Sequence, residues 1–472
     1  MKKVNLLGLI LFYFSLGTSE AQFTDLLNFN GTNGASPGGS LTLMGNKLFG
    51  VAYSGGAHDS GCVFSIDTNG NNYKDLLDFN GTNGASPLAT LVPSLSGKVL
   101  YGTTELGGAH HDGCIFSIDT NGNNYKDLFD FNGSDGELIY SSLILSGGLL
   151  FGTTAQGGTN YSSGTIFSID TNGINFKSLF DFDVTNGQFP VGSMTLIGNV
   201  LYGMTYLGGS SGDGTVYQID TNGSNFRSLI NFTGTNGSNP VSSLTLSGKT
   251  FYGMTSAGGA HDSGCIFSID TDGSRFVDRF DFTGINGATP YSALTLSASG
   301  KTLFGMTFLG GAHDSGCVFS IDTNGSSYKI LLNGNHVHGA KPLGYKSLLL
   351  TGNVLYGMTS AGGTNNDGII FKLDTNNNIS TSISEISSTK GLINVYPNPN
   401  NGIFTLSQSN LNTACSIEIY NILGEKVYTE HLAQSQSSNT INLTGQPSGV
   451  YFYRVLEQDG GLVGSGKLVI QK

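Results

Sequence analysis

The sequence contains no tryptophan, and only 11% of its 472 residues are charged. Few lysines and glutamates beside 71 glycines argue against helices and favour short strands joined by tight turns. The net charge of −12 at pH 7 makes nucleic acid an unfavourable partner, because the chain would repel a phosphate backbone. No long apolar run follows the first 20 residues, so we expect no membrane-spanning segment in the mature chain.

Cysteine is scarce as well, with five residues in all. Cys62, Cys114, Cys265 and Cys317 occupy one position of an internal repeat, and Cys415 stands apart. Equivalent positions in neighbouring repeats are expected about 10 Å apart, beyond the limit of about 7 Å between the Cα atoms of a disulfide. We interpret these cysteines as small buried apolar residues rather than as a disulfide framework, which the odd count also disfavours.

The N-terminus has the pattern of a secretory signal peptide. Lys2 and Lys3 precede an apolar run over residues 6–16, and small residues at positions 19 and 21 precede a cleavage site before Gln22. The alternative is a membrane anchor, for which the run is short. We therefore predict a signal peptide at residues 1–21 and a protein that works outside the cytoplasm.

One motif, of the form Leu-Phe-Gly-Met-Thr at residues 303–307, occurs seven times with small variations. The Asp that closes each copy recurs every 50–52 residues, at Asp67, Asp119, Asp170, Asp220, Asp270, Asp322 and Asp374. A fixed period of this length with several short strands per unit is typical of the blades of a β-propeller.

Each unit is predicted to contain four strands, which we call a, b, c and d. In the sixth unit they are residues 293–296, 302–307, 317–321 and 328–332. The Asn-Gly pair that follows strand c in most copies predicts a type I′ hairpin, because both residues tolerate positive φ. Strand b carries a glycine at its third position in every copy, which indicates a close approach of another backbone or side chain; these are Gly50, Gly102, Gly152, Gly203, Gly253, Gly305 and Gly357.

The order of the strands predicts how the array closes. After Asp374 no strand d follows, whereas residues 23–29, ahead of the first repeat, copy the strand d at residues 73–79. The N-terminal strand can therefore complete the last blade beside residues 369–374, which removes an open sheet edge. We predict an all-β fold in which residues 22–375 form a seven-bladed propeller of four-stranded blades.

The connections also predict a functional face. Because strands alternate in direction, the d→a and b→c loops emerge on one side, and these are the long ones, such as residues 80–87 and 107–113. Loops on a rigid scaffold are the usual place for ligands, so we expect any binding site on this long-loop side.

The motif Leu-Tyr-Gly-Met/Thr-Thr, then Gly-Gly, then Gly-x-Val/Ile-Phe-x-Ile/Leu-Asp, resembles the GloVer-type tandem repeat of bacterial secreted proteins. The resemblance covers about 350 residues in seven copies. It implies a propeller-like repeat and no general activity.

His-Asp pairs recur on the b→c loops, as at His58-Asp59 and His313-Asp314, and His, Asp and Cys are metal-ligand types. We interpret the pairs as turn formers, because they are dispersed around a ring and other blades replace the His. Residues 67–75 vaguely match a calcium loop but lack its sixth-position Gly and terminal Glu, so a hairpin explains them better. We predict no metal site and no cofactor.

Residues that depart from the repeat pattern are the better candidates for binding, because residues common to all copies serve the scaffold. No acid/base pair or nucleophile stands out, so no catalytic residue is assigned. His336 and His338 are two positions apart, so their side chains would point the same way on an extended segment. The binding candidates are Glu105, Glu137, Tyr140, Tyr161, Tyr206, Phe308, His336, His338 and Lys341.

Residues 376–391 have the Asn, Ser and Thr content of a linker, and residues 392–472 show seven candidate strands, enough for a small β-sandwich. The motifs in this segment resemble the type A C-terminal sorting domain of the type IX secretion system; they include Tyr396, Pro397, Asn398, Pro399, Gly449, Tyr451 and Lys467. The resemblance implies the type IX machinery as a partner, passage across the outer membrane, and then release or attachment to the cell surface. The alternative is an ordinary adhesive sandwich.

Three functions remain open on the sequence. The first is a secreted or surface-held, non-catalytic propeller that binds a glycan or a protein through its long-loop side. The second is a glycan-active hydrolase or lyase on the same scaffold, and the third is a structural surface protein. Near-identical loops in four blades favour binding or structure, since an enzyme needs one asymmetric site.

Overall fold

The computed structural model describes residues 23–159, 163–342, 347–375, 393–408, 415–421, 425–432, 438–457 and 462–472. In these ranges every regular element is a β-strand, and no helix is long and apolar enough to cross a membrane. The chain divides into two compact units, Met1–Asn377 and Asn378–Lys472. The predicted signal peptide and linker lie outside the described residues.

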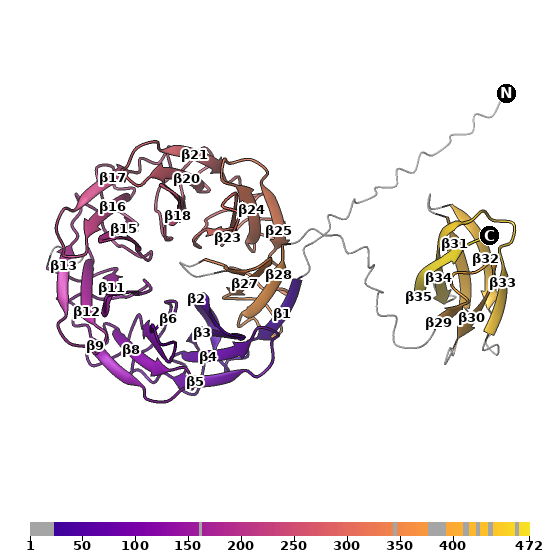
Figure 1. Cartoon of the computed structure of the whole chain (residues 1–472), viewed down its shortest axis with the longest axis horizontal. Coiled ribbons are helices and arrows are strands. Elements are labelled where there is room, and N and C mark those ends of the chain that lie inside the picture. The colour runs from indigo at the N-terminus through magenta and orange to yellow at the C-terminus, as the bar shows by residue number, and fades with distance from the viewer. Residues whose placement is uncertain are drawn as a thin grey trace, which may run out of the picture. The chain divides into compact units, whose positions relative to one another are not determined.

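The first unit consists of seven four-stranded antiparallel sheets, which Figure 1 shows arranged in a ring. The innermost strands are β2 (Ala35–Met44), β6 (Val92–Pro93), β10 (Ile144–Ser146), β14 (Thr195–Ile197), β18 (Thr245–Ser247), β22 (Thr295–Leu296) and β26 (Leu349–Thr351). The second strands are β3 (Lys47–Ser54), β7 (Val99–Thr103), β11 (Leu149–Thr154), β15 (Val200–Thr205), β19 (Thr250–Thr255), β23 (Thr302–Thr307) and β27 (Val354–Thr359).

The third strands are β4 (Cys62–Asp67), β8 (Cys114–Asp119), β12 (Thr165–Asp170), β16 (Thr215–Asp220), β20 (Cys265–Asp270), β24 (Cys317–Asp322) and β28 (Ile369–Asp374). The outermost are β5 (Lys74–Asp78), β9 (Lys126–Asp130), β13 (Lys177–Asp181), β17 (Arg227–Asn231), β21 (Val277–Asp281), β25 (Lys329–Asn333) and β1 (Phe23–Asn28). The all-β, seven-bladed architecture with four strands per blade is confirmed, and β23 has the predicted bounds.

The N-terminal strand β1 is the outer strand of the last sheet. It pairs antiparallel with β28, with Phe23 opposite Leu373 and Asn28 opposite Ile369. The rings of Phe23 and Phe371 lie 5.7 Å apart across this pair. The predicted position of the N-terminal strand beside residues 369–374 is therefore confirmed.

The core lies between neighbouring sheets. A Cβ atom added to Gly253 in β19 would lie 2.5 Å from Cζ of Phe267, the residue opposite it in β20. Phe267 in turn packs in a buried cluster with Phe232 and Tyr202 of the preceding sheet. The close approach predicted at the strand-b glycine is confirmed, and the group that approaches is an aromatic side chain.

The turn between the third and fourth strands differs from the prediction. In the first repeat Gly70 donates its N–H to Asp67 O at 2.9 Å, and the positive φ angles are those of Gly70 and Asn72, not of Asn69. A type I′ turn needs positive φ at both Asn69 and Gly70, so that prediction is wrong. Asn72 Nδ2 instead donates to Asp67 Oδ2 at 2.8 Å and closes a longer turn.

The cysteines are buried and free, as the sequence predicts. Cys114 at the start of β8 has no exposed surface, and its sulfur lies 3.3 Å from the hydroxyl of Thr104. Burial raises the pKa of the Cys114 thiol to about 12, so it stays protonated at neutral pH.

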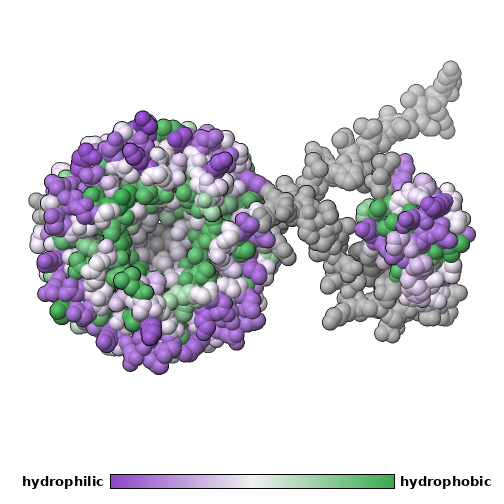
Figure 2. All heavy atoms as spheres, viewed as in Figure 1, coloured by the Kyte–Doolittle hydropathy of each residue, from purple (hydrophilic) through white to green (hydrophobic). Residues whose placement is uncertain are grey.

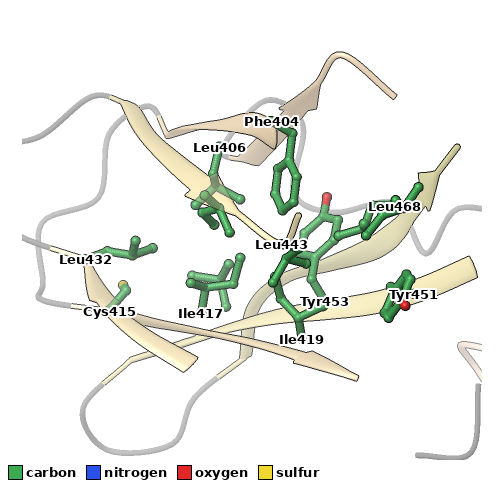
Figure 3. Packing of buried hydrophobic residues seen from close by; sticks show 13 residues of the cluster. Phe404, Leu406, Cys415, Ile417, Ile419, Leu432, Leu443, Tyr451, Tyr453 and Leu468 are labelled. Carbon is green, nitrogen blue, oxygen red and sulfur yellow. The ribbon is translucent and has the colours of Figure 1, made fainter. Parts of the chain in front are cut away.

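The second unit has two antiparallel sheets, one ordered β29-β30-β33 and the other β32-β31-β34-β35. Its strands are β29 (Ile393–Tyr396), β30 (Ile403–Gln408), β31 (Cys415–Tyr420), β32 (Lys426–Leu432), β33 (Ser438–Asn442), β34 (Gly449–Glu457) and β35 (Leu462–Ile470). Figure 3 shows side chains of both sheets meeting in one core, among them Leu406, Ile417 and Tyr453. All seven predicted strands are present.

Candidate functional site

The d→a and b→c loops lie together and bond to each other. Ala85 donates its N–H to Leu106 O at 2.7 Å, and Gly108 donates to Gly81 O at 2.9 Å. These bonds place both sets of long loops on one side of the ring, as the strand connections predict.

On this side five b→c loops contain a left-handed Asp, His or Asn residue, and each repeat has a further non-glycine residue with a left-handed backbone in the segment that follows the outer strand. It comes just before the inner strand, and its φ lies between 49° and 58°; the seven residues are Ser36, Ser86, Leu138, Phe189, Asn239, Thr289 and Lys341. Such a conformation is unfavourable for a residue with a Cβ atom, most of all for β-branched Thr289. In a chain with 71 glycines, none of these seven positions is a glycine. The left-handed position therefore keeps a side chain despite the backbone strain.

A second variable position lies beside the first. It follows the second strand of each blade, and its occupants are Tyr53, Glu105, Ala155, Tyr206, Ser256, Phe308 and Ser360. In six repeats its N–H donates to the carbonyl of the left-handed residue, for example from Tyr206 to Phe189 at 3.0 Å and from Phe308 to Thr289 at 3.1 Å. We call these fourteen residues the rim.

Glu105 and two tyrosines form one cluster on the rim. Glu105 is only 9% exposed, and the hydroxyl of Tyr140 donates to its Oε1 atom at 3.1 Å. The hydroxyl of Tyr53 is hydrogen-bonded to the same carboxyl. Burial raises the pKa of Glu105, and the two tyrosine hydroxyls oppose that shift.

A second cluster lies further round the rim. The rings of Tyr291 and Phe308 are 5.2 Å apart. Tyr291 also packs with Tyr206, Phe189 and the buried Val241. Burial, and then the neighbouring Tyr206, raise the pKa of Tyr291. The rim thus combines aromatic faces with hydroxyl groups and one shielded carboxyl group.

Four of the predicted binding residues, namely Glu105, Tyr140, Tyr206 and Phe308, lie in these two clusters. Tyr53, Phe189 and Tyr291 belong to them too and were missed, although Tyr53 shares the repeat position of Glu105. That shared position is the signal that could have found Tyr53.

The remaining candidates have other surroundings. Burial, and then the negative charge of Asp112, raise the pKa of Glu137. The segment of His336 and His338 forms a bend rather than an extended strand, so the argument that they point the same way does not hold. Nδ1 of His338 lies 3.7 Å from a carboxylate oxygen of Asp25 in β1.

Lys341 is exposed at the left-handed position, where its N–H donates to Ser315 O at 2.9 Å. Tyr161 lies outside the described residues.

The His-Asp loops are held by their aspartates. Oδ1 of Asp59 accepts the N–H of Gly55 at 2.9 Å, and Asp314 does the same for Gly310 at 2.8 Å. His58 and His313 stay exposed. The pairs therefore shape the loop, as the turn interpretation predicts.

Among the described residues, one group has the spacing of metal ligands, namely Cys114, Asp127 and Asp130. Cys114 Sγ lies 3.3 Å from the hydroxyl of Thr104, and Oδ1 of Asp130 accepts the N–H of Ala109 at 3.0 Å. This arrangement is explained by the scaffold.

Of the predicted sorting residues, Asn398 and Lys467 lie where the loop between β29 and β30 meets β35, whereas Tyr451 is buried in the core of the unit. Asn398 Nδ2 donates to Lys467 O, and Asn398 Oδ1 accepts the N–H of Val469, both at 2.8 Å. The hydroxyl of Tyr451 donates to Pro447 O at 2.8 Å. Gly449 pairs with Ile470, while Tyr396 is half exposed.

Solved structures similar to this chain include proteins of several kinds. One is the extracellular domain of a protein described as a one component system from B. thetaiotaomicron, with 12% identity over 96% of this chain and 58% of that chain, and a TM-score of 0.48. Another is a fungal alcohol oxidase of the AA5 family in complex with copper, with 10% identity over 96% and 99% and a TM-score of 0.45. This chain spans little more than half the length of the first of these proteins. A search of curated proteins finds no match to this chain.

Two family models match the sequence. The secretion system C-terminal sorting domain matches residues 394–471, and this type IX sorting signal indicates export to the cell surface or the extracellular space. The Gloeobacter/Verrucomicrobia repeat matches residues 8–215, 93–260 and 198–416. The chain therefore belongs to the Gloeobacter/Verrucomicrobia repeat family, with a type IX sorting domain at its C-terminal end.

Proposed function

We propose that the protein is an exported, non-catalytic binding protein whose rim holds a glycan. The observation that carries the proposal is the rim itself. The backbone of the two adjacent rim positions is alike from repeat to repeat, whereas their side chains differ among the repeats. A constant frame with variable side chains at one end is how rigid all-β scaffolds present binding residues.

The chemistry of the rim supports a glycan as the ligand. Phe308 and Tyr206 offer flat apolar faces that are only partly buried. The partly exposed Ser36 and Thr289 and the exposed Lys341 offer hydrogen-bonding groups. A sugar ring has apolar C–H faces and hydroxyl edges, so it can use both kinds of group at once. A protein ligand is the competing outcome of the test below.

The test is a glycan array probed with the full chain and with rim variants. Phe308→Ala and Tyr206→Ala should each weaken binding about tenfold or more, because an aromatic contact at the centre of a site often contributes over 1 kcal/mol. Leu95→Ala is the matched control, since Leu95 is 98% exposed in a turn on the opposite side. Binding that survives both rim changes, or that falls equally in the control, would refute the rim site.

One observation favours the competing proposal of a glycan-active enzyme. Burial raises the pKa of Glu105, and a carboxylic acid with a raised pKa can act as a general acid. Hydrolysis needs a second group, which in most glycosidases is another carboxylate. Release of reducing ends from a glycan bound by the array, abolished in Glu105→Gln, would favour the enzyme over the binding protein.

We propose that residues 392–472 direct the second step of export and that residues 1–21 direct the first. Deletion of residues 392–472 should leave the propeller unit in the periplasm of the producing cell, because it would cross only the inner membrane. Immunoblots of the periplasm, outer surface and medium check this. Undiminished appearance of the truncated chain outside the cell would contradict the proposal.

A further inference from the structure

A cavity lies at the centre of the ring. Its volume is about 740 Å³, and its wall is made by the inner strands of all seven blades. It reaches Ala298 and Gly352, which are exposed in the short a→b turns, and includes neither Glu105 nor Phe308 of the rim. The cavity therefore faces the turn side, opposite the long loops. Figure 2 shows the hollow at the centre of the ring, with hydrophobic residues around it on the face displayed.

A row of hydroxyl groups encircles this cavity. One inner-strand position carries Ser or Thr in six of the seven repeats, and the residues are Ser40, Thr90, Ser142, Ser193, Ser243 and Ser347, with Ala293 in the sixth repeat. Each hydroxyl oxygen from Thr90 to Ser243 accepts the backbone N–H of the preceding repeat's residue at 2.7–3.0 Å. The row is thus fixed in place by the bonds that join the blades.

The next row toward the turn side mixes aliphatic residues with threonines. It includes Ile144 and Leu349, and the hydroxyls of Thr245 and Thr295 are committed to carbonyl groups of the following repeat at 2.6 Å. None of the described lining residues carries a charge. The wall therefore combines a row of hydroxyl groups with a second row that presents the aliphatic side chains of Ile144 and Leu349 beside threonines whose hydroxyls are already bonded.

We propose that this turn-side cavity is a second binding site, which takes an uncharged saccharide of a few units. The volume lies within the range of small-molecule sites, about 300–1,000 Å³. A charged ligand would lose its hydration and find no opposite charge among the described wall residues, which is costly. A neutral sugar can hydrogen-bond to the hydroxyl row and lay its C–H faces on aliphatic side chains such as those of Ile144 and Leu349. This site is independent of the rim.

Ala293 offers the cleanest way to block the cavity. It is the one member of the hydroxyl row without a hydroxyl group, so Ala293→Phe fills the space without removing an oxygen that links two blades. Ala293→Ser is the matched control, because it completes the row and adds little volume. Ala298→Trp, at an exposed turn position, narrows the mouth of the cavity. It tests the same blockage if Ala293→Phe fails to fold.

The experiment is calorimetric titration of the full chain with cellotriose, maltotriose and triacetylchitotriose, beside trigalacturonic acid as the charged analogue. At least one neutral trisaccharide should bind, Ala293→Phe and Ala298→Trp should weaken it about tenfold or more, and Ala293→Ser should stay within about threefold of the wild type. Phe308→Ala should leave this binding unchanged, which separates the cavity from the rim.

Three outcomes would overturn the proposal: no neutral trisaccharide binds, the blocked variants bind as well as the wild type, or the acidic trisaccharide binds as tightly as the neutral ones. Failure of the rim proposal alone would appear differently, as an array signal that Phe308→Ala does not change.

Discussion

At the scale of single residues, Asp75 and Asp78 in β5 place two carboxyl groups side by side. Burial, and then the charge of Asp78, raise the pKa of Asp75 from 3.8 to about 6. An acid with a higher pKa in the folded chain holds its proton more tightly there, so folding stability falls as the pH rises from about 3.8 through about 6. In the third repeat Ser178 stands at the position of Asp75 and donates to Asp181 Oδ1 at 2.9 Å.

The substitution Asp75→Ser should therefore stabilise the protein above pH 6, by up to about 1 kcal/mol because the pair is partly open to water. At pH 3.5 most of the gain should be lost, since Asp75 is then largely protonated in both states. Urea unfolding at pH 3.5 and pH 7.5 measures the difference. Ser178→Asp is the reverse variant, and it should lose stability only at the higher pH. A gain for Asp75→Ser that is equal at both pH values would contradict the charge argument.

The rim illustrates what single residues reveal before a structure is known. Glu105, Tyr206 and Phe308 stand out because they break a repeated pattern. Tyr291 does not stand out, since its role depends on its distance to Phe308 across a turn, which spacing along the chain does not give. Contacts between repeats, such as that of Tyr140 with Glu105, depend on the curvature of the ring in the same way.

At the scale of the strands, the glycine of each second strand makes room for the aromatic residue of the third. Gly253→Ala should destabilise the protein by about 1–3 kcal/mol, because the new methyl group would lie 2.5 Å from the ring of Phe267. Chemical unfolding measures the loss.

The control for this prediction is the same change in a background with a smaller third-strand residue. In Phe267→Leu, which removes the ring atoms nearest Gly253, adding Gly253→Ala should cost clearly less than it does in the wild type. An equal cost in both backgrounds would mean that the backbone preference of Gly253, and not the packing of Phe267, sets the effect.

Strand positions were predictable to different degrees. The second and third strands follow their β-branched and aromatic runs closely, as β23 does. The inner strands other than β2 are shorter than predicted, because residues ahead of them bond to the next repeat instead of to their own blade. Ser142, for example, donates its N–H to Ser193 Oγ at 2.7 Å just before β10 begins. Strand propensity cannot distinguish these two kinds of partner.

At the scale of the whole molecule, the count of strands predicted that β1 would join the last blade. The last repeat lacks its own outer strand, and β1 is a copy of an outer strand that no other repeat needs. It did not predict the central cavity. The cavity depends on which atoms of seven inner strands face one axis, and on hydroxyl groups such as that of Thr90 being held by the preceding repeat at 2.9 Å. The long loops led us to predict a site on one side of the ring, whereas the central cavity lies toward the other side.

The pairing of β1 with β28 predicts a specific cross-link. Thr24 lies opposite Lys372, so Thr24→Cys with Lys372→Cys should form a disulfide on oxidation. It would link two ends of the propeller unit that are far apart in the sequence, and bridges over long loops typically add about 2–4 kcal/mol by restricting the unfolded chain. The melting temperature should rise on oxidation and return to that of the wild type in reductant. Asp374→Cys in place of Lys372→Cys is the matched control, because a diagonal partner two residues away lies about 7–8 Å from Thr24, too far for a bridge. A bond that forms equally well with position 374, or with neither, would show that β1 does not hold this register in solution.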